Sequence, residues 1–337
     1  SHVLVTAGPD GVELAATDME LSLRVPLEAD VAEGGSVAIP RLAGDIVRTM
    51  SDGEVAVEHR ANEGVTTVSG GRSSFSLNCM QAADFPELPG AAEGGALTIP
   101  TVDLVETAER VVKAASRDET RPVLTGVLVS HGPDGLTMVA TDSYRLAVKR
   151  SSLEGTPAEV SEAIVPARAL AELGRLAAAT KADTTEIVIA GGQAQFRLGG
   201  VILTTRLIDG QFPDQRQLIP DTFEHEVVFD RGELGAVLAR IAVLAQRNSP
   251  VRLAFDEGRV TISTISEQVG EGREEIPIAF AGEPMDVGFN VEFLRAGVES
   301  IDGDEVRFGV ISPLRPGLLS GTDDDYRYLL MPIRLNA

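Results

Sequence analysis

The chain has 337 residues, enough for two or three domains that each bury a hydrophobic core. A net charge of −22 excludes attraction of nucleic acid to the molecule as a whole, and an aromatic content of 4% argues against an aromatic platform for single strands. No apolar run approaches the roughly 18 residues of a membrane span, no signal peptide is recognisable, and the single cysteine cannot form an intramolecular disulfide, so we expect a cytoplasmic protein.

The first predicted element is a β-hairpin at residues 3–24, where alternating apolar residues flank the turn GPDG. Residues 127–150 repeat it at a constant offset, with Val3 corresponding to Val127, and they keep both GPDG and the later ATD unchanged. A looser third copy starts at Val251. A period this long is typical of tandem copies of a whole domain and not of a solenoid.

Asp/Phe-Pro segments that end at Pro89 and Pro220 read as linkers between the copies. They divide the chain into predicted domains 1–89, 90–220 and 221–337. The second and third copies begin with a strand and a helix before the hairpin, whereas the first begins at the hairpin. We therefore expect domain one to lack its first strand and helix in this sequence, with Ser1 and His2 as a cloning remnant.

A fainter repeat within each copy consists of a short strand, a Pro or Asn, and an amphipathic helix, as in residues 36–50, 97–112, 162–177 and 285–301. Strands follow each helix, as in 186–209. The pattern predicts an α+β fold of six modules, two in each domain, with helices on one side of antiparallel sheets. It does not fit βαβ units with a parallel sheet.

Five predicted helices, at 41–50, 102–117, 167–181, 232–247 and 290–299, together carry a slight positive charge, while the rest of the chain is strongly acidic. In 102–117 the predicted apolar stripe consists of Leu104, Ala108, Val111 and Ala115. The opposite, basic faces are either ordinary solvated surface that complements the helix dipoles or a surface that faces a polyanion. The residues alone leave both readings open.

The search for catalytic chemistry finds no enzyme. Four histidines are scattered without metal-ligand spacing, and no nucleophile elbow or phosphate-binding glycine motif occurs. Cys79 is predicted to be a packing residue, and the acidic run 323–325 a solvated loop, since it lacks calcium-loop spacing. We expect no metal and no cofactor.

Four segments together resemble one family: ATDSYRLAVKR (140–150), SGGRSSFSLNCMQAADFPELP (69–89), RLIDGQFPDQRQLIP (206–220) and the ending YLLMPIRL (328–335). The chain resembles the bacterial DNA polymerase III beta subunits, the DNA sliding clamps, over essentially its whole length. The resemblance implies a three-domain subunit that pairs head to tail into a homodimeric ring. Such a ring encircles double-stranded DNA without reading its sequence and acts as a processivity factor in DNA replication.

In this family helices line the hole of the ring. The resemblance therefore implies that basic residues on the predicted helices face the DNA. These are Arg41, Arg48, Arg110, Lys113, Arg117, Arg168, Arg175, Lys181, Arg240, Arg247 and Arg295. The ring interface is implied to join Phe75 and Leu77 of domain one to Val243 and Leu244 of domain three.

The resemblance also implies a groove between domains two and three. It takes short peptides, typically a Gln followed by Leu and Phe anchors, from the polymerase III catalytic subunit, the clamp loader and repair proteins. The matching positions are Leu124, Thr141, Ser143, Tyr144, Arg145, Leu146, Pro213, Gln217, Leu218, Leu314, Pro316, Leu329, Met331, Pro332, Ile333, Arg334 and Leu335.

Several of these positions carry an alternative or depart from the family's pattern. Leu124 and Leu146 could instead be core residues at strand ends. Many relatives have His where Tyr144 stands and a basic residue where Gln217 stands, and residues 336–337 extend the usual Arg-Leu end. Two other functions compete with a clamp: a structural repeat protein without a nucleic-acid role, and a carboxylate-based metal enzyme, for which the spacing of Asp and Glu gives no support.

Overall fold

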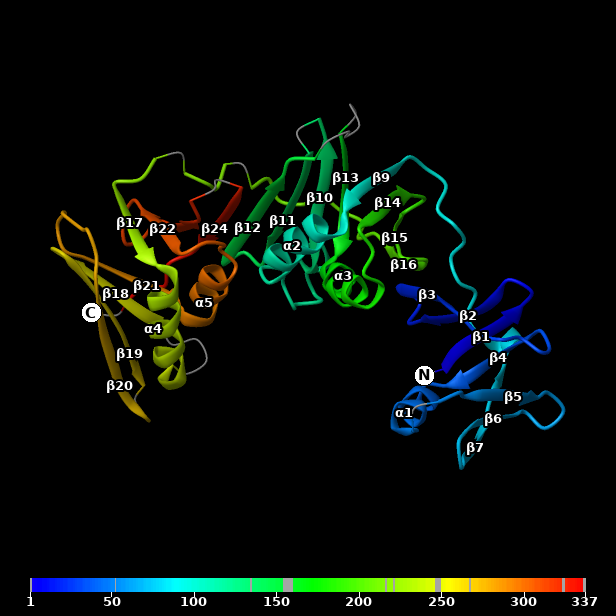
Figure 1. Ribbon diagram of the computed structural model, residues 1–337. Helices are drawn as coiled ribbons and strands as arrows, with labels where there is room; N and C mark the ends of the chain where they lie inside the picture. Colours follow the sequence, from blue (N-terminus) through cyan, green and yellow to red (C-terminus); the bar gives the residue numbers. More distant parts are fainter. Residues whose placement is uncertain are drawn as a thin grey trace. The chain divides into compact units, whose positions relative to one another are not determined.

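The computed structural model describes residues 2–51, 53–133, 135–153, 160–215, 217–220, 222–245, 250–266, 268–322 and 325–335. Figure 1 labels its helices and strands. Its internal contacts divide the chain into two compact units. Unit one contains Ser1–Val102 and Arg175–Leu207, and unit two contains Asp103–Gly174 and Ile208–Ala337. No helix within the described ranges is long and apolar enough to cross a membrane.

Unit one is built on a nine-stranded antiparallel sheet. In spatial order its strands are β8 (Met80–Gln81), β4 (Gly35–Pro40), β1 (His2–Gly8), β2 (Gly11–Thr17), β3 (Leu21–Leu27), β16 (Val201–Arg206), β15 (Gln193–Leu198), β14 (Thr184–Ala190) and β9 (Ala96–Pro100). A three-stranded sheet contains β5 (Ala56–Arg60), β6 (Val65–Gly70) and β7 (Ser73–Asn78), and the helical segments are α1 (Leu42–Thr49) and the short η1 (Ala82–Asp84).

Unit two is built on an eight-stranded antiparallel sheet. In spatial order its strands are β13 (Ser161–Pro166), β10 (Gly126–Gly132), β11 (Gly135–Thr141), β12 (Arg145–Ser151), β24 (Tyr326–Leu330), β23 (Gly317–Ser320), β22 (Glu305–Val310) and β17 (His225–Asp230). A four-stranded sheet has the order β20 (Gly270–Pro277), β19 (Arg259–Ser266), β18 (Pro250–Asp256) and β21 (Met285–Asn290).

The longer helices are α2 (Thr101–Val112), α3 (Ala167–Thr180), α4 (Arg231–Leu244) and α5 (Val291–Glu299), and a short η2 (Pro122–Thr125) precedes β10. Helices α4 and α5 pack against each other, and α4 also packs on β19 and β20. At the start of α4 and α5, Asp230 and Asn290 cap the helix by accepting hydrogen bonds from backbone N–H groups of its first turn. The α+β fold with antiparallel sheets is confirmed.

The three predicted hairpins are all present, as β1–β2, β10–β11 and β18–β19. In the first two copies the GPDG turn needs its last glycine. Gly11 and Gly135 have φ values of +115° and +101°, and a Cβ on Gly135 would lie 2.2 Å from the carbonyl oxygen of Ser151. Repetition of the turn sequence therefore reflects a repeated backbone requirement.

The apolar stripe predicted for the second helix is confirmed, because Leu104, Ala108, Val111 and Ala115 are all buried. The predicted end of that helix at residue 117 is wrong: α2 ends at Val112. After Val112 the Ala114 and Ala115 N–H groups donate to carbonyl oxygens three residues back, and the Ser116 N–H donates to the Leu124 carbonyl oxygen at 2.8 Å, so the chain leaves the helical pattern. Helix α3 likewise ends one residue earlier than predicted, with Lys181 in a left-handed conformation at φ +52°.

The two large sheets run across the predicted domain boundaries. Strand β3 of the first copy pairs with β16 of the second, and β12 of the second pairs with β24 of the third. The first of these pairings is called the first junction below, and the second is called the second junction. Each junction buries an edge strand of one copy against the next.

Candidate functional site

The second junction brings two distant segments of the predicted groove side by side. In the β12–β24 register Arg145 lies opposite Leu330 and Leu146 lies opposite Leu329. Beyond the last pair, the Met331 N–H donates to the Tyr144 carbonyl oxygen at 2.8 Å. The groove residues of the ATD turn and of the chain end are therefore neighbours.

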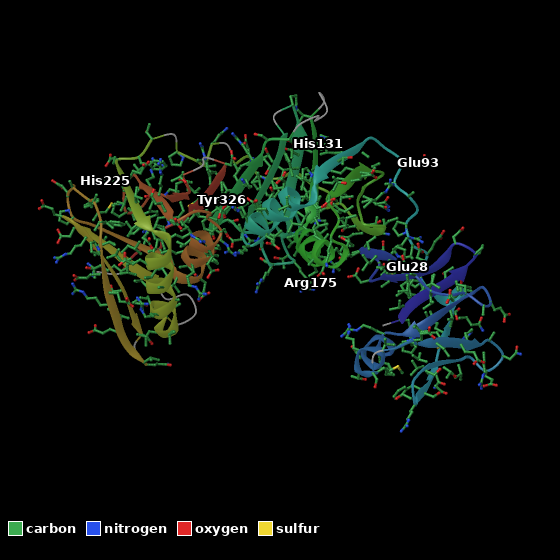
Figure 2. The ribbon with its side chains drawn as sticks, in the orientation of Figure 1. Glu28, Glu93, His131, Arg175, His225 and Tyr326 are labelled. Atoms are coloured by element: carbon green, nitrogen blue, oxygen red, sulfur yellow. The ribbon has the colours of Figure 1, made fainter. Side chains whose placement is uncertain are left out.

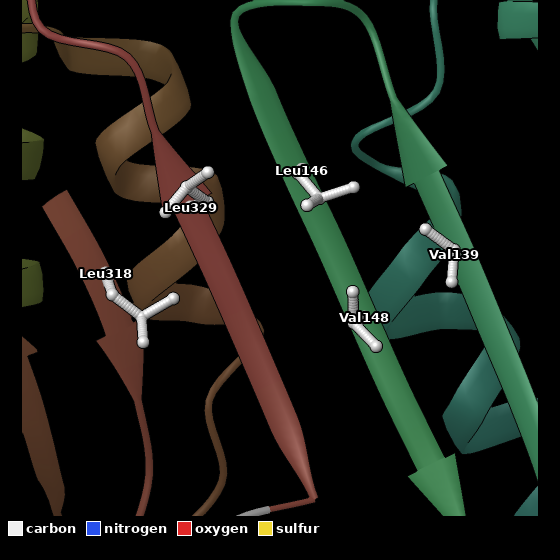
Figure 3. Packing of buried hydrophobic residues seen from close by; sticks show 5 residues of the cluster. All are labelled: Val139, Leu146, Val148, Leu318 and Leu329. Atoms are coloured by element: carbon white, nitrogen blue, oxygen red, sulfur yellow. The ribbon is translucent and has the colours of Figure 1, made fainter. Parts of the chain in front are cut away.

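One face of this junction carries an apolar cluster, which consists of Val139, Leu146, Val148, Leu318 and Leu329 from β11, β12, β23 and β24 (Figure 3). All five side chains are buried. The half-buried Leu128, Phe212, Ile219 and Phe223 pack against them. Leu146 and Leu329 thus form part of the core of the isolated chain, as the alternative reading of Leu146 expected.

Sequence reasoning identified two members of the apolar cluster and missed the other three. Val148 follows Leu146 by two positions and Leu318 lies opposite Leu329 in the β23–β24 register, so all face the same side of the sheet. The two-residue alternation in 146–148 was a usable signal for Val148. Leu318 could be found only from the pairing of β23 with β24.

The ATD turn holds its shape by side-chain to backbone hydrogen bonds. Thr141 Oγ1 donates to the Arg145 carbonyl oxygen at 2.6 Å, and Asp142 Oδ1 accepts from the N–H groups of Tyr144 and Arg145 at 2.9 and 3.0 Å. Ser143 takes a φ of +80°. The result is that Tyr144 stands outward, with 61% of its surface exposed.

Arg145 supports this turn from inside the unit. Its side chain is only 13% exposed, its Nε donates to Asp142 Oδ2 at 2.9 Å, and its guanidinium carbon lies 4.2 Å from the ring centroid of Phe293. Arg145 Nη1 also donates to the hydroxyl of Tyr328 at 3.3 Å. Burial raises the pKa of that Tyr328 hydroxyl to about 12.

Several of the remaining predicted groove positions carry exposed apolar side chains. Leu218, Leu314 and Met331 are 42%, 68% and 38% exposed. Leu124 is buried on η2, and the preceding Arg121 donates from Nη1 to Ser143 Oγ at 3.2 Å. The predicted positions that are exposed or half-buried also include Pro213, Pro316, Gln217, Pro332 and Arg334.

Residues 333–335, at the end of the described chain, pack against Gly288 on β21. The Ile333 N–H donates to the Gly288 carbonyl oxygen at 2.7 Å, and Leu335 lies so close to Gly288 that a Cβ there would be 2.7 Å from it. A hollow of about 300 Å3 beside the apolar cluster is lined by Phe223, Leu318 and Arg307, among others. Residues 336–337 lie outside the described part of the chain.

The predicted DNA-facing residues fall into two groups. Exposed side chains on or next to the helices form the first, which consists of Arg41, Arg48, Lys113, Arg117, Arg168, Arg175 (labelled in Figure 2) and Lys181. Arg41 precedes α1, and Lys113, Arg117 and Lys181 follow their helices. Arg247 lies outside the described residues.

The second group is engaged with carboxylates. Arg110 is 16% exposed and pairs with Glu106 at 3.0 Å and Asp302 at 3.3 Å. Arg240 donates two hydrogen bonds to the carboxylate of Glu274, which hold the pKa of that carboxyl below its ordinary value. Arg295 pairs with Glu299 one turn along α5 at 3.1 Å, and in the first group Arg48 pairs with Asp45 at 3.2 Å.

The four predicted interface residues lie on two edges, one in each unit. Phe75 is 42% exposed on β7, an edge strand of the three-stranded sheet, and Leu77 on the same strand is half-buried. Val243 is 82% exposed near the end of α4. Leu244 packs towards β20, an edge strand, where a Cβ on Gly272 would lie 2.8 Å from it.

Among the described residues, no three His, Cys, Asp or Glu side chains lie close enough together to hold a metal ion. Asp325 pairs with Lys149 at 4.0 Å, and residues 323–324 of the acidic run lie outside the described ranges.

Comparison with known proteins gives one consistent result. Three family models match, described as the N-terminal domain (residues 1–89), the central domain (98–214) and the C-terminal domain (216–334) of the DNA polymerase III beta subunit. The beta sliding clamp of Synechococcus elongatus is 36% identical over 98% of this chain and 90% of its own length. That of Streptomyces coelicolor is 32% identical over 99% of this chain and 92% of its own length.

The fold agrees with these relatives. The DNA polymerase III subunit beta from Pseudomonas aeruginosa superposes with a TM-score of 0.90 at 30% identity, covering 99% of this chain and 93% of that one. Sliding clamps are processivity factors and not enzymes, and a structural repeat protein without a nucleic-acid role is not favoured. With three matching domain models and relatives above 30% identity over nearly its whole length, the chain belongs to the DNA polymerase III beta subunit family, the DNA sliding clamps.

Proposed function

We propose that this chain is a sliding clamp that encircles double-stranded DNA as a homodimeric ring and tethers its partners through the second junction. The observation that carries the tethering role is the apolar cluster, with the exposed Tyr144 and Met331 joined by a backbone hydrogen bond at the same junction. Exposed aliphatic and aromatic side chains around an apolar floor are the surface that short Leu- and Phe-anchored peptides require. The partners are the polymerase III catalytic subunit, the clamp loader and repair proteins, and we propose a cytoplasmic location.

For DNA, we propose that the first group of basic residues meets the phosphates. Lysine and arginine side chains on an exposed surface contact phosphate without reading base sequence, and such screened contacts are weak enough to permit sliding. Arg48, Arg240 and Arg295 would first have to exchange their carboxylate partners for phosphate. The acidic remainder of the chain disfavours DNA elsewhere on the surface.

For the ring, we propose that β7 with Phe75 and Leu77 meets the surface formed by Val243 and Leu244 on a second copy. Edge strands with exposed apolar side chains are stabilised when a partner covers them. A head-to-tail contact of two different surfaces closes into a ring when its rotation permits.

The test is topological. The chain is loaded on nicked circular DNA with a clamp loader and ATP, separated from free protein by gel filtration, and the DNA is then cut once with a restriction enzyme. We expect the protein to stay with the circle and to dissociate after linearisation, because a ring can leave only over an end. Equal retention on circular and linear DNA would contradict encirclement.

A further inference from the structure

Strand β24 carries part of the apolar cluster on one face and two tyrosines on the other. Leu329 belongs to the cluster, whereas Tyr326 (labelled in Figure 2) and Tyr328 lie on the opposite side of the sheet, because side chains alternate along a strand. The two tyrosine rings stack with their centroids 6.3 Å apart, and the residues are 2% and 0% exposed. Two phenol hydroxyls are therefore buried behind the strand that carries part of the predicted groove.

Both hydroxyls have partners inside unit two. Tyr326 Oη donates to the backbone carbonyl oxygen of Arg110 on α2 at 3.3 Å, and the Arg110 guanidinium carbon lies 6.0 Å from the Tyr326 ring centroid. The Tyr328 hydroxyl accepts from Arg145 Nη1 and donates to the Phe293 carbonyl oxygen on α5 at 3.0 Å. Burial raises the pKa of both hydroxyls, so they stay protonated and remain hydrogen-bond donors.

The side chain of Arg110 also joins the second copy to the third. It is only 16% exposed, and it pairs with Glu106 of its own helix at 3.0 Å and with Asp302, beyond the end of α5, at 3.3 Å. Two arginines of the second copy thus hold two tyrosines of the third. This group is called the clasp below, and it consists of Arg110, Arg145, Tyr326 and Tyr328.

The first junction has no such clasp. Thr204 lies opposite the repeat counterpart of Leu146, as Leu329 lies opposite Leu146 itself. Counting back along the two strands, Val201 and Leu203 therefore stand at the positions of the two tyrosines. Both are buried aliphatic residues without a hydroxyl. The clasp consequently depends on the residues of the second junction and is not imposed by strand pairing alone.

We propose that Arg110 is a positioning residue of the second junction and not a DNA contact: through the clasp it holds β24 in register on β12, and so fixes the peptide groove that this strand carries. A one-residue slip would bring the tyrosines to the groove face and Leu329 to the helix side. Buried hydroxyls with fixed partners on α2 and α5 therefore select one register. The charge of Arg110 is already offset by Glu106 and Asp302, which weakens its attraction for phosphate. Only the effect on peptide binding rests on the proposed tethering function.

Hydrogen–deuterium exchange of the full chain tests the clasp without DNA or peptide. Tyr326→Phe removes only the hydroxyl, and Arg110→Lys keeps the charge but loses the planar guanidinium that pairs with two carboxylates. We expect both variants to accelerate exchange of the β24 amides about tenfold, with the β1 amides of unit one unchanged. Lys113→Gln, just beyond α2, is the control without effect. Unchanged β24 exchange in both clasp variants, or equal acceleration of β1, would overturn the proposal.

Salt dependence separates a DNA contact from a positioning residue. Fluorescence anisotropy of a labelled DNA duplex gives the affinity across a series of salt concentrations. For Arg110→Gln we expect the slope of log affinity against log salt concentration to stay that of the unaltered chain, whereas Lys113→Gln should lower it by about one unit. The same decrease in the Arg110 variant would make Arg110 a phosphate contact and overturn the proposal.

Calorimetry with a synthetic Gln-Leu-Ser-Leu-Phe peptide measures the effect on the groove. We expect Tyr326→Phe and Arg110→Lys to weaken peptide binding about threefold, although neither residue lies on the groove face of the sheet. Unchanged affinity in both variants would overturn the positioning role. If the unaltered chain binds no peptide, the proposed tethering function fails, and the β24 exchange and the salt slope then decide whether Arg110 holds the junction.

Discussion

At the level of single residues, the ATD turn shows how a short polar motif exposes an apolar side chain. Asp142 accepts backbone hydrogen bonds and pairs with the Arg145 side chain, so its carboxylate is fully engaged in holding the turn. Tyr144 at the tip does not contribute to these bonds through its side chain and is exposed. Its replacement should therefore affect binding and not folding.

We expect Tyr144→Ala to weaken binding of a Gln-Leu-Ser-Leu-Phe peptide about tenfold, because the substitution removes an aromatic ring from the rim of an apolar site. The melting temperature should change little. Calorimetry gives the affinity and differential scanning fluorimetry the stability. Val57→Ala, at a valine on β5 that is 53% exposed, is the control with unchanged affinity. An unaltered Kd for Tyr144→Ala would show that Tyr144 does not contribute to peptide binding.

His131 on β10 provides a pH-dependent contribution to stability. Its buried Nδ1 has no hydrogen-bond partner among the described residues, and desolvation lowers the pKa of its imidazole below the ordinary value of about 6.5. The folded chain therefore favours the neutral ring, and the unfolded chain binds the proton more readily. The contribution is fully present above about pH 6.5 and disappears as the pH falls through the lower, folded-state pKa.

We expect urea unfolding of the chain to show stability falling as the pH is lowered below about 6.5, and His131→Gln to reduce that slope by removing the titrating group. His59→Gln makes the same substitution on β5 and is the matched control. An identical slope in the His131 variant would assign the acid sensitivity to the carboxylates alone.

At the level of elements, the basic residues within α2 differ in their surroundings from those that follow its end. Arg110 lies within α2, where Glu106, Asp302 and the Tyr326 ring at 6.0 Å hold it in place. A charge reversal there would break a packed cluster as well as any DNA contact. Lys113 and Arg117 follow the helix and are exposed, so substitutions there test DNA contact without disturbing a packed cluster.

We expect Lys113→Glu combined with Arg117→Glu to shorten retention on nicked circular DNA. The salt dependence of DNA binding should also fall, by about one unit of slope for each phosphate that the variant no longer neutralises. Retention is measured across a series of salt concentrations. Arg60→Glu with Arg259→Glu, at arginines 53% and 52% exposed on β5 and β19, makes the same change of charge on strands. Equal effects in both double variants would mean that net charge alone matters.

At the level of the whole molecule, the proposed ring interface consists of apolar side chains that are exposed in the isolated chain, such as Phe75 and Val243. Phe75→Asp on β7 is expected to weaken dimerisation by an order of magnitude or more, since a charge would replace a proposed interface anchor. Sedimentation velocity over a range of concentrations measures the effect. Val57→Asp on β5, the other edge of the same three-stranded sheet, is the control. A dimer that persists in the Phe75 variant would place the interface elsewhere.

The three copies and their hairpins could be predicted because their signals are local. A GPDG turn, alternating apolar residues and an amphipathic stripe act within about twenty residues of chain. The end of α2 at Val112 could not be predicted, because the chain beyond it turns and its Ser116 N–H is paired with the distant Leu124 carbonyl oxygen. The ion pair between Arg110 and Asp302 could not be predicted from the sequence either, because Asp302 lies in another copy.

The sequence by itself determined the repeated domain, the turn chemistry of each hairpin, the segregation of basic residues near helices, and the family. Only the tertiary structure decided how the copies join. The pairing of β3 with β16 and of β12 with β24 links strands far apart in sequence, and it buries apolar side chains at one junction and the polar Ser22, Gln195 and Thr204 at the other. Cross-strand registers between distant segments select which side chains share a face, and no local pattern contains that information.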